Sequence, residues 1–282
     1  MTRATLFAAI TLSATAVACD EAGDTPSSDE ATLRASFDAL PALGADAVYE
    51  GWIIVDGAPV STGRFSEGDN VFTADAAFIE SATNYVLTIE PAVGDVPAPS
   101  DVHLLGGDLA SGGATLTTTH PAAIGVNVDD AMGTFILATP TTMAMEDFAQ
   151  GIWYLDPANG PAASLSLPEL PSGWVYEGWV VGADGPVSTG RFSAAMGMDS
   201  DGAGATAGPD GAPPFPGQDF IDPAVSLIGY TAVISVEPQP DDSPAPFALK
   251  PLGGMITDAG EGTLQPLDTL GEVLPTGAVV VE

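Results

Sequence analysis

Two stretches of the chain are near-copies of each other. The segments 49–52 (Tyr-Glu-Gly-Trp) and 59–66 (Pro-Val-Ser-Thr-Gly-Arg-Phe-Ser) return as 176–179 and 186–193. Both return after the same offset of 127 positions (176 − 49 and 186 − 59), a length typical of one domain. The sequence therefore predicts a tandem duplication of one folding unit.

Each copy predicts a β-hairpin followed by a further strand. The hairpin comprises residues 48–55, a turn at 56–59 and residues 60–65, with counterparts at 175–181, 182–185 and 186–192. The strand 85–91 returns as 232–238, an offset of 147, so the second copy carries 20 extra residues (147 − 127). Period-two alternation directs Leu87 and Ile89 to a core, and Thr88 and Glu90 away from it.

Short strands separated by glycine and proline predict an all-β fold. The chain has 33 Gly and 25 Pro, which favours two tandem β-sandwich (Ig-like) domains. In chain order, residues 133–137 are expected to close the first domain and 277–281 the second, while 151–155 open the second. A helical turn is expected only at 143–148.

The N-terminus predicts export. An apolar run, Leu6 to Ala18, is too short to span a bilayer and precedes Cys19, the only cysteine. This pattern resembles a lipoprotein signal in which Cys19 is lipidated, and the alternative is an ordinary secretory signal that leaves a free cysteine. The expected product is a membrane-anchored lipoprotein in the periplasm or at the cell surface, attached to the membrane through its N-terminal lipid alone.

The expected domain plan follows from these signals. It places a signal peptide at 1–18, an acidic disordered tether at 19–34, the first repeat at 35–140, a linker at 141–149 and the second repeat at 150–282. The second repeat carries an acidic, Gly/Pro-rich insert at 198–220.

The charge of the chain limits its partners. Five Lys+Arg stand against 38 Asp+Glu, for a formal net charge of −33. Such a surface repels nucleic acid and anionic lipid, so no nucleic-acid partner is expected. It is compatible with cation binding, or simply with a solvated acidic coat that keeps the protein dispersed.

The order of short motifs is similar to the extracytoplasmic C-terminal domain of anti-sigma-K factors. The motifs are Leu-Pro-x-Leu, Tyr-x-x-Trp, Pro-Val-Ser-x-Gly-x-Phe, Glu-Pro and Pro-x-Pro, found at 40–43, 49–52, 59–65, 90–91 and 97–99, and again at 167–170, 176–179, 186–192, 237–238 and 244–246. The resemblance implies a periplasmic β-sandwich of sensory or interaction type. It does not imply sigma-factor inhibition, which in that family belongs to a cytoplasmic domain that we do not expect in this chain.

The sequence gives little support for catalysis. The two histidines, His103 and His120, occupy unrelated contexts in the first repeat and have no counterparts in the second. No Gly-x-Ser-x-Gly motif is present, and two histidines with one lipidated cysteine do not form a zinc ligand set. The protein is therefore expected not to be an enzyme and to need no cofactor, calcium excepted.

Calcium is the metal that the second repeat favours. Its insert contains Asp199, Asp201, Asp210 and Asp219, with glycines after the second and third of these aspartates. Carboxylates beside tight turns can converge on a hard cation. The full twelve-residue calcium loop is absent, and an acidic flexible loop is the alternative interpretation.

The repeated polar residues of the hairpin are candidate interaction residues: Tyr49, Glu50, Arg64, Tyr176, Glu177 and Arg191. Regular hairpin pairing places Arg64 on the face of Tyr49, where it would stack. A bulged hairpin places it beside Glu50 as a salt bridge instead. A role in anchoring an anionic ligand or partner is the functional alternative.

We expect a non-catalytic, lipid-anchored envelope protein that acts as an interaction or sensing module, with an unknown envelope protein or ligand as its partner. The alternative is an extracellular carbohydrate-binding module or hydrolase that uses the repeated Tyr/Trp/Glu hairpin face. Clustering of Tyr49, Glu50 and Glu90 in one concave pocket would favour this alternative. Their dispersal over opposite faces would favour the interaction module.

Overall fold

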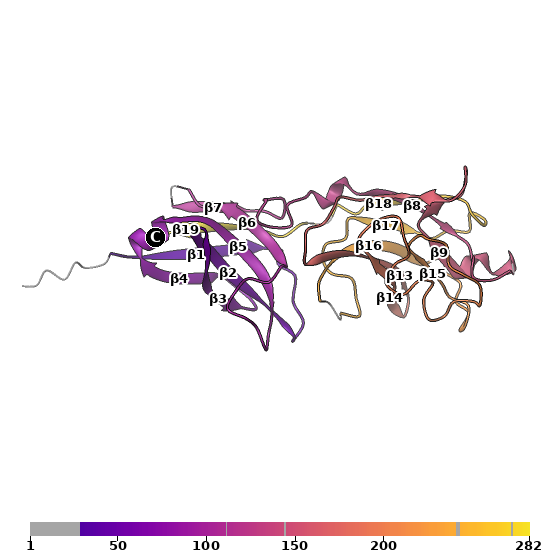
Figure 1. Ribbon diagram of the computed structural model, residues 1–282, viewed down its shortest axis with the longest axis horizontal. Helices are drawn as coiled ribbons and strands as arrows, with labels where there is room; N and C mark the ends of the chain where they lie inside the picture. Colours follow the sequence, from indigo (N-terminus) through magenta and orange to yellow (C-terminus); the bar gives the residue numbers. More distant parts are fainter. Residues whose placement is uncertain (1–28, 111, 144, 241–242, 272) are drawn as a thin grey trace, which may run out of the picture.

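The protein consists of two β-lobes placed end to end (Figure 1). This computed structural model describes residues 29–110, 112–143, 145–240, 243–271 and 273–282. The predicted signal peptide at 1–18 and the predicted lipidation site Cys19 lie outside these residues. The predicted all-β fold class is confirmed: helical structure among the described residues amounts to one α-helix, α1 (Ala76–Glu80), and two 3₁₀ turns, η1 (Val128–Asp130) and η2 (Met145–Gln150).

The first lobe is a sandwich of two four-stranded antiparallel sheets. One sheet has the order β3 (Ala58–Phe65), β2 (Ala47–Val55), β5 (Ala82–Pro91) and β6 (His103–Asp108). The other has the order β4 (Asn70–Asp75), β1 (Glu30–Asp38), β19 (Thr276–Val281) and β7 (Gly113–Leu116). Leu33, Tyr49 and Leu87 are fully buried in the core, in agreement with the predicted inward face of residues 87 and 89.

The second lobe repeats this plan in a more continuous form. Its main sheet has the order β14 (Gly185–Phe192), β13 (Trp174–Gly182), β16 (Thr231–Pro238), β17 (Leu252–Met255), β18 (Gln265–Thr269), β8 (Met132–Leu137), β9 (Gly151–Trp153) and β15 (Gly217–Asp219). β12 (Leu165–Ser166) pairs with β8, and β10 (Leu155–Asp156) pairs with β11 (Ala162–Ala163). β8 and β18 lie over β13 and β16 (Figure 1), which gives a sandwich-like arrangement.

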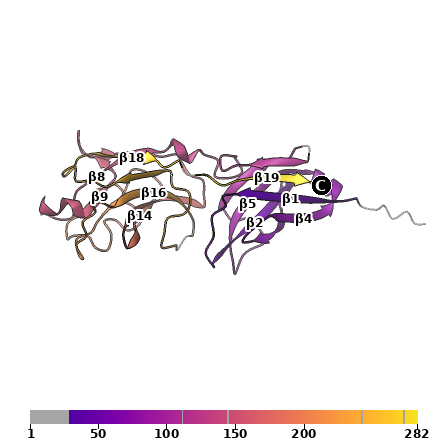
Figure 2. The ribbon, with the colours of Figure 1, turned by 180° about the vertical axis from the view of Figure 1, so that it is seen from behind.

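The closing strands differ from the sequence prediction. β19, expected to close the second domain, pairs with β1 of the first lobe from Leu33↔Val281 to Asp38↔Thr276. β8, expected to close the first domain, pairs with β12 and β18 of the second lobe. Figures 1 and 2 show the yellow β19 beside the indigo β1. Because β19 lies between β1 and β7 as β8 lies between β12 and β18, the two repeats exchange equivalent strands.

This exchange also moves the expected boundaries. Residues 30–34, assigned to the tether, form the first half of β1, because β4 pairs with residues 30–35 and β19 with residues 33–38. The second lobe begins with β8 at Met132, before the expected linker at 141–149. The helical turn expected at 143–148 is observed as η2, whereas α1 was missed. This short helix is capped by Asp75, whose carboxylate accepts from the backbone N–H groups of Ala77 and Phe78.

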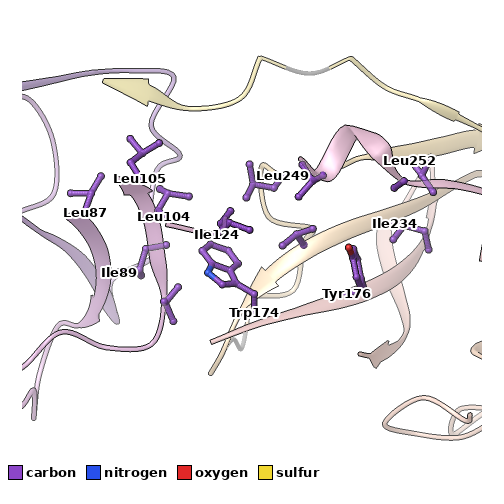
Figure 3. Packing of buried hydrophobic residues seen from close by; sticks show 14 of the residues in the cluster. Leu87, Ile89, Leu104, Leu105, Ile124, Trp174, Tyr176, Ile234, Leu249 and Leu252 are labelled. Carbon is purple, nitrogen blue, oxygen red and sulfur yellow. The ribbon is translucent and has the colours of Figure 1, made fainter. Parts of the chain in front are cut away.

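The lobes share one buried core. Trp174, at the start of β13, packs beside Leu104 of β6 and beside Ile124 in the connection between β7 and β8 (Figure 3). Its indole Nε1 donates to the backbone oxygen of His103 at 3.2 Å. None of the helices among the described residues has the length and the apolar character needed to cross a bilayer.

Candidate functional site

Most of the repeated motif residues bind one another within each lobe. The hydroxyl of Tyr49 donates to the backbone oxygen of Pro41 at 2.7 Å, so the Leu-Pro-x-Leu motif supplies the acceptor. The indole Nε1 of Trp52 donates to the hydroxyl of Thr88 at 2.9 Å. The second lobe repeats these bonds between Tyr176 and Pro168 (2.7 Å) and between Trp179 and Ser235 (2.8 Å).

The Glu-Pro motif holds the loop that follows its strand. Glu90 Oε1 accepts from the backbone N–H of Ser100 at 2.8 Å and from the hydroxyl of Thr88. The second lobe has the same pair of bonds, to Glu237 from Phe247 (2.8 Å) and Ser235. Thr88 and Glu90 therefore point away from the hydrophobic core as predicted, but the loop buries them.

The repeated arginine lies beside the repeated glutamate. A β-bulge between Gly51 and Trp52 brings Glu50 opposite Arg64, with 3.6 Å between Arg64 Nε and Glu50 Oε2. In the second lobe Arg191 Nε donates to Glu177 Oε2 at 2.8 Å. The bulged alternative is therefore correct. Arg64 also contacts Asp95, at 3.8 Å, and the backbone oxygen of Pro91, so it joins the hairpin to the loop after β5.

The first-lobe hairpin does not bring Tyr49 together with Glu50 and Glu90 in one pocket. Tyr49 lies in the hydrophobic core, whereas Glu50, one residue along the strand, lies on the opposite face of the sheet. Glu50 pairs with Thr88 across the ladder and shares its face with Glu90. All four tryptophans, Trp52, Trp153, Trp174 and Trp179, are at most 5% exposed. This dispersal favours the interaction module over the carbohydrate-binding alternative.

A polar groove of about 790 Å³ lies beside the Glu177–Arg191 pair in the second lobe. Trp174 and Trp179 contribute to one part of its wall, and Ser200 and Asp201 of the acidic insert to another. The insert thus forms part of the surface of this groove. The sequence indicated the insert as the main asymmetry between the repeats, but not that it lies against the repeated hairpin.

Asp199 and Asp201 lie together beneath Gly190 of the hairpin. A Cβ placed on Gly190 would lie 2.5 Å from Asp201 Oδ1 and 2.7 Å from Asp199 Oδ2. Asp199 is 9% exposed, and its Oδ2 accepts from the backbone N–H of Gly217 at 2.9 Å. Burial, with the neighbouring Asp201 carboxyl, raises the pKa of Asp199 to about 7.

The other two aspartates predicted to bind calcium lie apart from this pair. Asp210 is exposed. Asp219 is fully buried, and it accepts from the indole of Trp153 at 2.7 Å and from the hydroxyl of Thr141 at 2.5 Å. Within the described ranges, no group of three or more His, Cys, Asp or Glu residues is arranged to hold a metal ion. A calcium site in this insert would therefore have Asp199 and Asp201 as its carboxylate ligands.

A second cavity lies between the two lobes. This interlobe cleft has a volume of about 570 Å³ and is lined mainly by Leu43, Ile89, Val102, Pro238, Pro240 and Phe247, with Glu90 among them. Glu90 is 1% exposed, and its Oε2 has no hydrogen-bond partner. Burial raises the pKa of Glu90, against the lowering effect of its bonds from Thr88 and Ser100. The cleft was not predicted, because residues from both repeats line it.

The histidines have local partners. His103 Nδ1 lies 3.0 Å from the backbone oxygen of Ala122, and His120 Nε2 lies 3.2 Å from Asp108. Neither contact involves a serine. The two histidines thus each have a local structural partner.

Residues 6–103 match the family model described as anti-sigma-K factor rskA, C-terminal. The match begins inside the apolar run before Cys19 and continues to the first residue of β6. No curated protein and no solved structure matches the chain. The chain is therefore similar to this family over its first repeat, where the resemblance drawn from the motifs is confirmed.

Proposed function

We propose that the chain is an exported, lipid-anchored envelope protein whose two lobes act together as a non-catalytic interaction or sensing module. Its match to the C-terminal region of anti-sigma-K factors supports an anti-sigma-factor-like module.

The interlobe cleft is the observation that carries this proposal. Binding sites often lie where two domains meet, with apolar walls and a few polar groups. Here the apolar walls include Leu43, Val102 and Phe247, and the buried carboxylate of Glu90 is one of the polar groups, with Asp46, Ser100, Gln239 and Ser243. A ligand or partner segment with an apolar body and one hydrogen-bond donor matches this chemistry.

The fold also supports sensing. β1 and the last residue of the chain pair at the outer end of the first lobe, with Thr32 N and Glu282 O 2.9 Å apart. A lipid on Cys19 would therefore anchor the first lobe at its outer end and leave the cleft and the second lobe farther from the membrane. A partner bound in the cleft contacts both lobes, so its binding affects their relative position.

Site-specific photocrosslinking in living cells tests the proposal. A photoreactive residue at Ala42, on the rim of the cleft, is expected to give a discrete crosslinked species. The same residue at Val71, exposed on β4 outside the cleft, serves as the control. Equal crosslinking at both positions, or none at Ala42, would count against the cleft. Membrane fractionation of Cys19→Ala tests the anchor, which is wrong if the variant still sediments with membranes.

A further inference from the structure

A buried polar network lies beneath the hairpin of the first lobe. Its centre is the side-chain amide of Asn70, whose Oδ1 accepts from the hydroxyls of Thr62 (2.5 Å) and Tyr85 (3.0 Å). Its Nδ2 donates to the backbone oxygens of Thr62 and Gly63, both at 3.2 Å. The neutral amide of Asn70 thus supplies the acceptor for the two hydroxyls and the donors for the two backbone oxygens of this network.

The second lobe has the same place with different chemistry. Thr189 is the repeat counterpart of Thr62, and it lies beneath Gly178 as Thr62 lies beneath Gly51. The hydroxyl of Tyr154 lies beside it, in the position that Tyr85 takes in the first lobe. Asp199 and Asp201 of the insert lie beneath Gly190, the counterpart of Gly63, so that carboxylates replace the amide of Asn70.

These oxygens lack the partners that Asn70 provides in the first lobe. Asp199 Oδ1 is buried without a hydrogen-bond donor, whereas the hydroxyls of Thr189 and Tyr154 lie close enough to interact with each other. Thr189 is 1% exposed and Tyr154 is fully buried. Unsatisfied buried polar atoms are rare in native proteins, and a buried carboxylate oxygen without a donor indicates a bound cation or water. Asp199 Oδ1 is an acceptor that lies beside the Asp201 carboxyl, so the partner that it lacks is a hydrogen-bond donor or a cation.

We propose that Asp199 and Asp201 bind a calcium ion at the place where the first lobe has the amide of Asn70. An all-oxygen set of carboxylates and hydroxyls suits a hard cation rather than zinc. Thr189 and Tyr154 would complete the site from below, and water would enter from the groove beside Asp201. This inference does not depend on the interlobe cleft.

The ligand set also indicates the affinity. Two carboxylates are fewer than in high-affinity calcium loops, and extracellular calcium modules bind with dissociation constants of about 0.1–1 mM. Mg²⁺ requires a near-ideal octahedron of short bonds and gives up its water reluctantly, so a site built on one exposed and one buried aspartate favours Ca²⁺.

Thermal unfolding of the full protein after EDTA treatment tests the proposal. Adding ~10 mM CaCl₂, well above such dissociation constants, is expected to raise the unfolding midpoint by several degrees. MgCl₂ at equal ionic strength serves as the control for charge screening. No calcium-dependent rise, or an equal rise with MgCl₂, would overturn the proposal.

Two variants keep the test specific. Asp199→Asn restores the amide chemistry of the first lobe, so we expect it to unfold at a higher temperature than the EDTA-treated parent and to lose the calcium response. Asp210→Asn removes the same charge from an exposed position of the same insert, and it should respond to calcium like the parent. A calcium response that persists in Asp199→Asn would overturn the proposal. Asp201→Asn, at the rim, provides a second test if Asp199→Asn does not fold.

Discussion

The exchange of β8 and β19 predicts that a core mutation near the C-terminus weakens the first lobe. Val279 of β19 is 2% exposed and belongs to the shared buried core. Val279→Ala removes two carbons, each worth about 0.8 kcal/mol when buried. With the cavity that remains, we expect a loss of about 2–3 kcal/mol. Because about 1.4 kcal/mol corresponds to a factor of ten, amide protection in the first lobe should fall roughly 30- to 100-fold.

Hydrogen–deuterium exchange measured by peptide provides the assay. Val279→Ala should accelerate exchange in β1 and β7 and leave β13 and β16 close to the parent. Phe135→Ala, the equivalent change in β8, should do the reverse in the second lobe, with a loss of about 3–5 kcal/mol. Val280→Ala, on the half-exposed side of the same strand, is the matched control and should have little effect. Faster exchange in β13 and β16 after Val279→Ala, with β1 unchanged, would refute the exchange.

Two further predictions concern buried polar groups. Burial raises the pKa of Glu90, so its contribution to stability is complete below the pKa of the unfolded chain and is lost as pH rises through the folded pKa. In urea unfolding at pH 5 and pH 8, Glu90→Gln should therefore gain stability relative to the parent as pH rises, whereas Glu169→Gln, at an exposed position, should not. A pH-independent difference between Glu90→Gln and the parent would contradict this assignment. Gly51→Ala places a Cβ 2.2 Å from the hydroxyl of Tyr85 and should lower the free energy of unfolding, measured by chemical denaturation, by about 1–3 kcal/mol. Gly44→Ala, whose Cβ meets no atom within 4 Å, should be close to neutral. Equal effects of the two substitutions would contradict the close packing at Gly51.

Local features of the fold could be predicted from the sequence. The hairpins were identified because a turn and its flanking alternation lie within about 20 residues, and the repeat doubled the signal. The Glu50–Arg64 pair could only be stated as one of two alternatives, because it depends on a bulge at Gly51 that shifts the register by one residue. The repeated residues proved to be mainly structural, as the contacts of Tyr49, Trp52 and Glu90 show.

Features that join distant segments could not be predicted. In a duplicated chain, each closing strand can pair in either of two equivalent positions, one in each lobe. The alternation of apolar and polar residues along the strand does not distinguish between these positions. Tyr154 could not be identified as the counterpart of Tyr85, because it comes from the junction between β9 and β10 rather than from the repeat position of Tyr85. The interlobe cleft combines residues from 42–47 with residues from 238–240 and 243–247, and it has no signature in any of these segments. The aspartates of the insert were identified by composition, but only the structure separates Asp199 and Asp201 from Asp219.

The arrangement of the two closing strands has a physical cause beyond chance. When two copies exchange a strand, each sheet keeps the same kind of strand pairing. The free energy of the exchange therefore depends on the size of the exchanged side chains and on the connections between the lobes. Phe135 fills the second-lobe slot and Val279 the first, and reversing them would overpack one core and leave a cavity in the other. The connection that carries β8 across also buries Ile124, beside Trp174 (Figure 3), and Val128 in the shared core. Each such side chain contributes about 1.5–3 kcal/mol, so the crossing itself stabilises the exchanged form. The chain consequently crosses between the lobes twice, and a partner that moves one lobe must also strain the other.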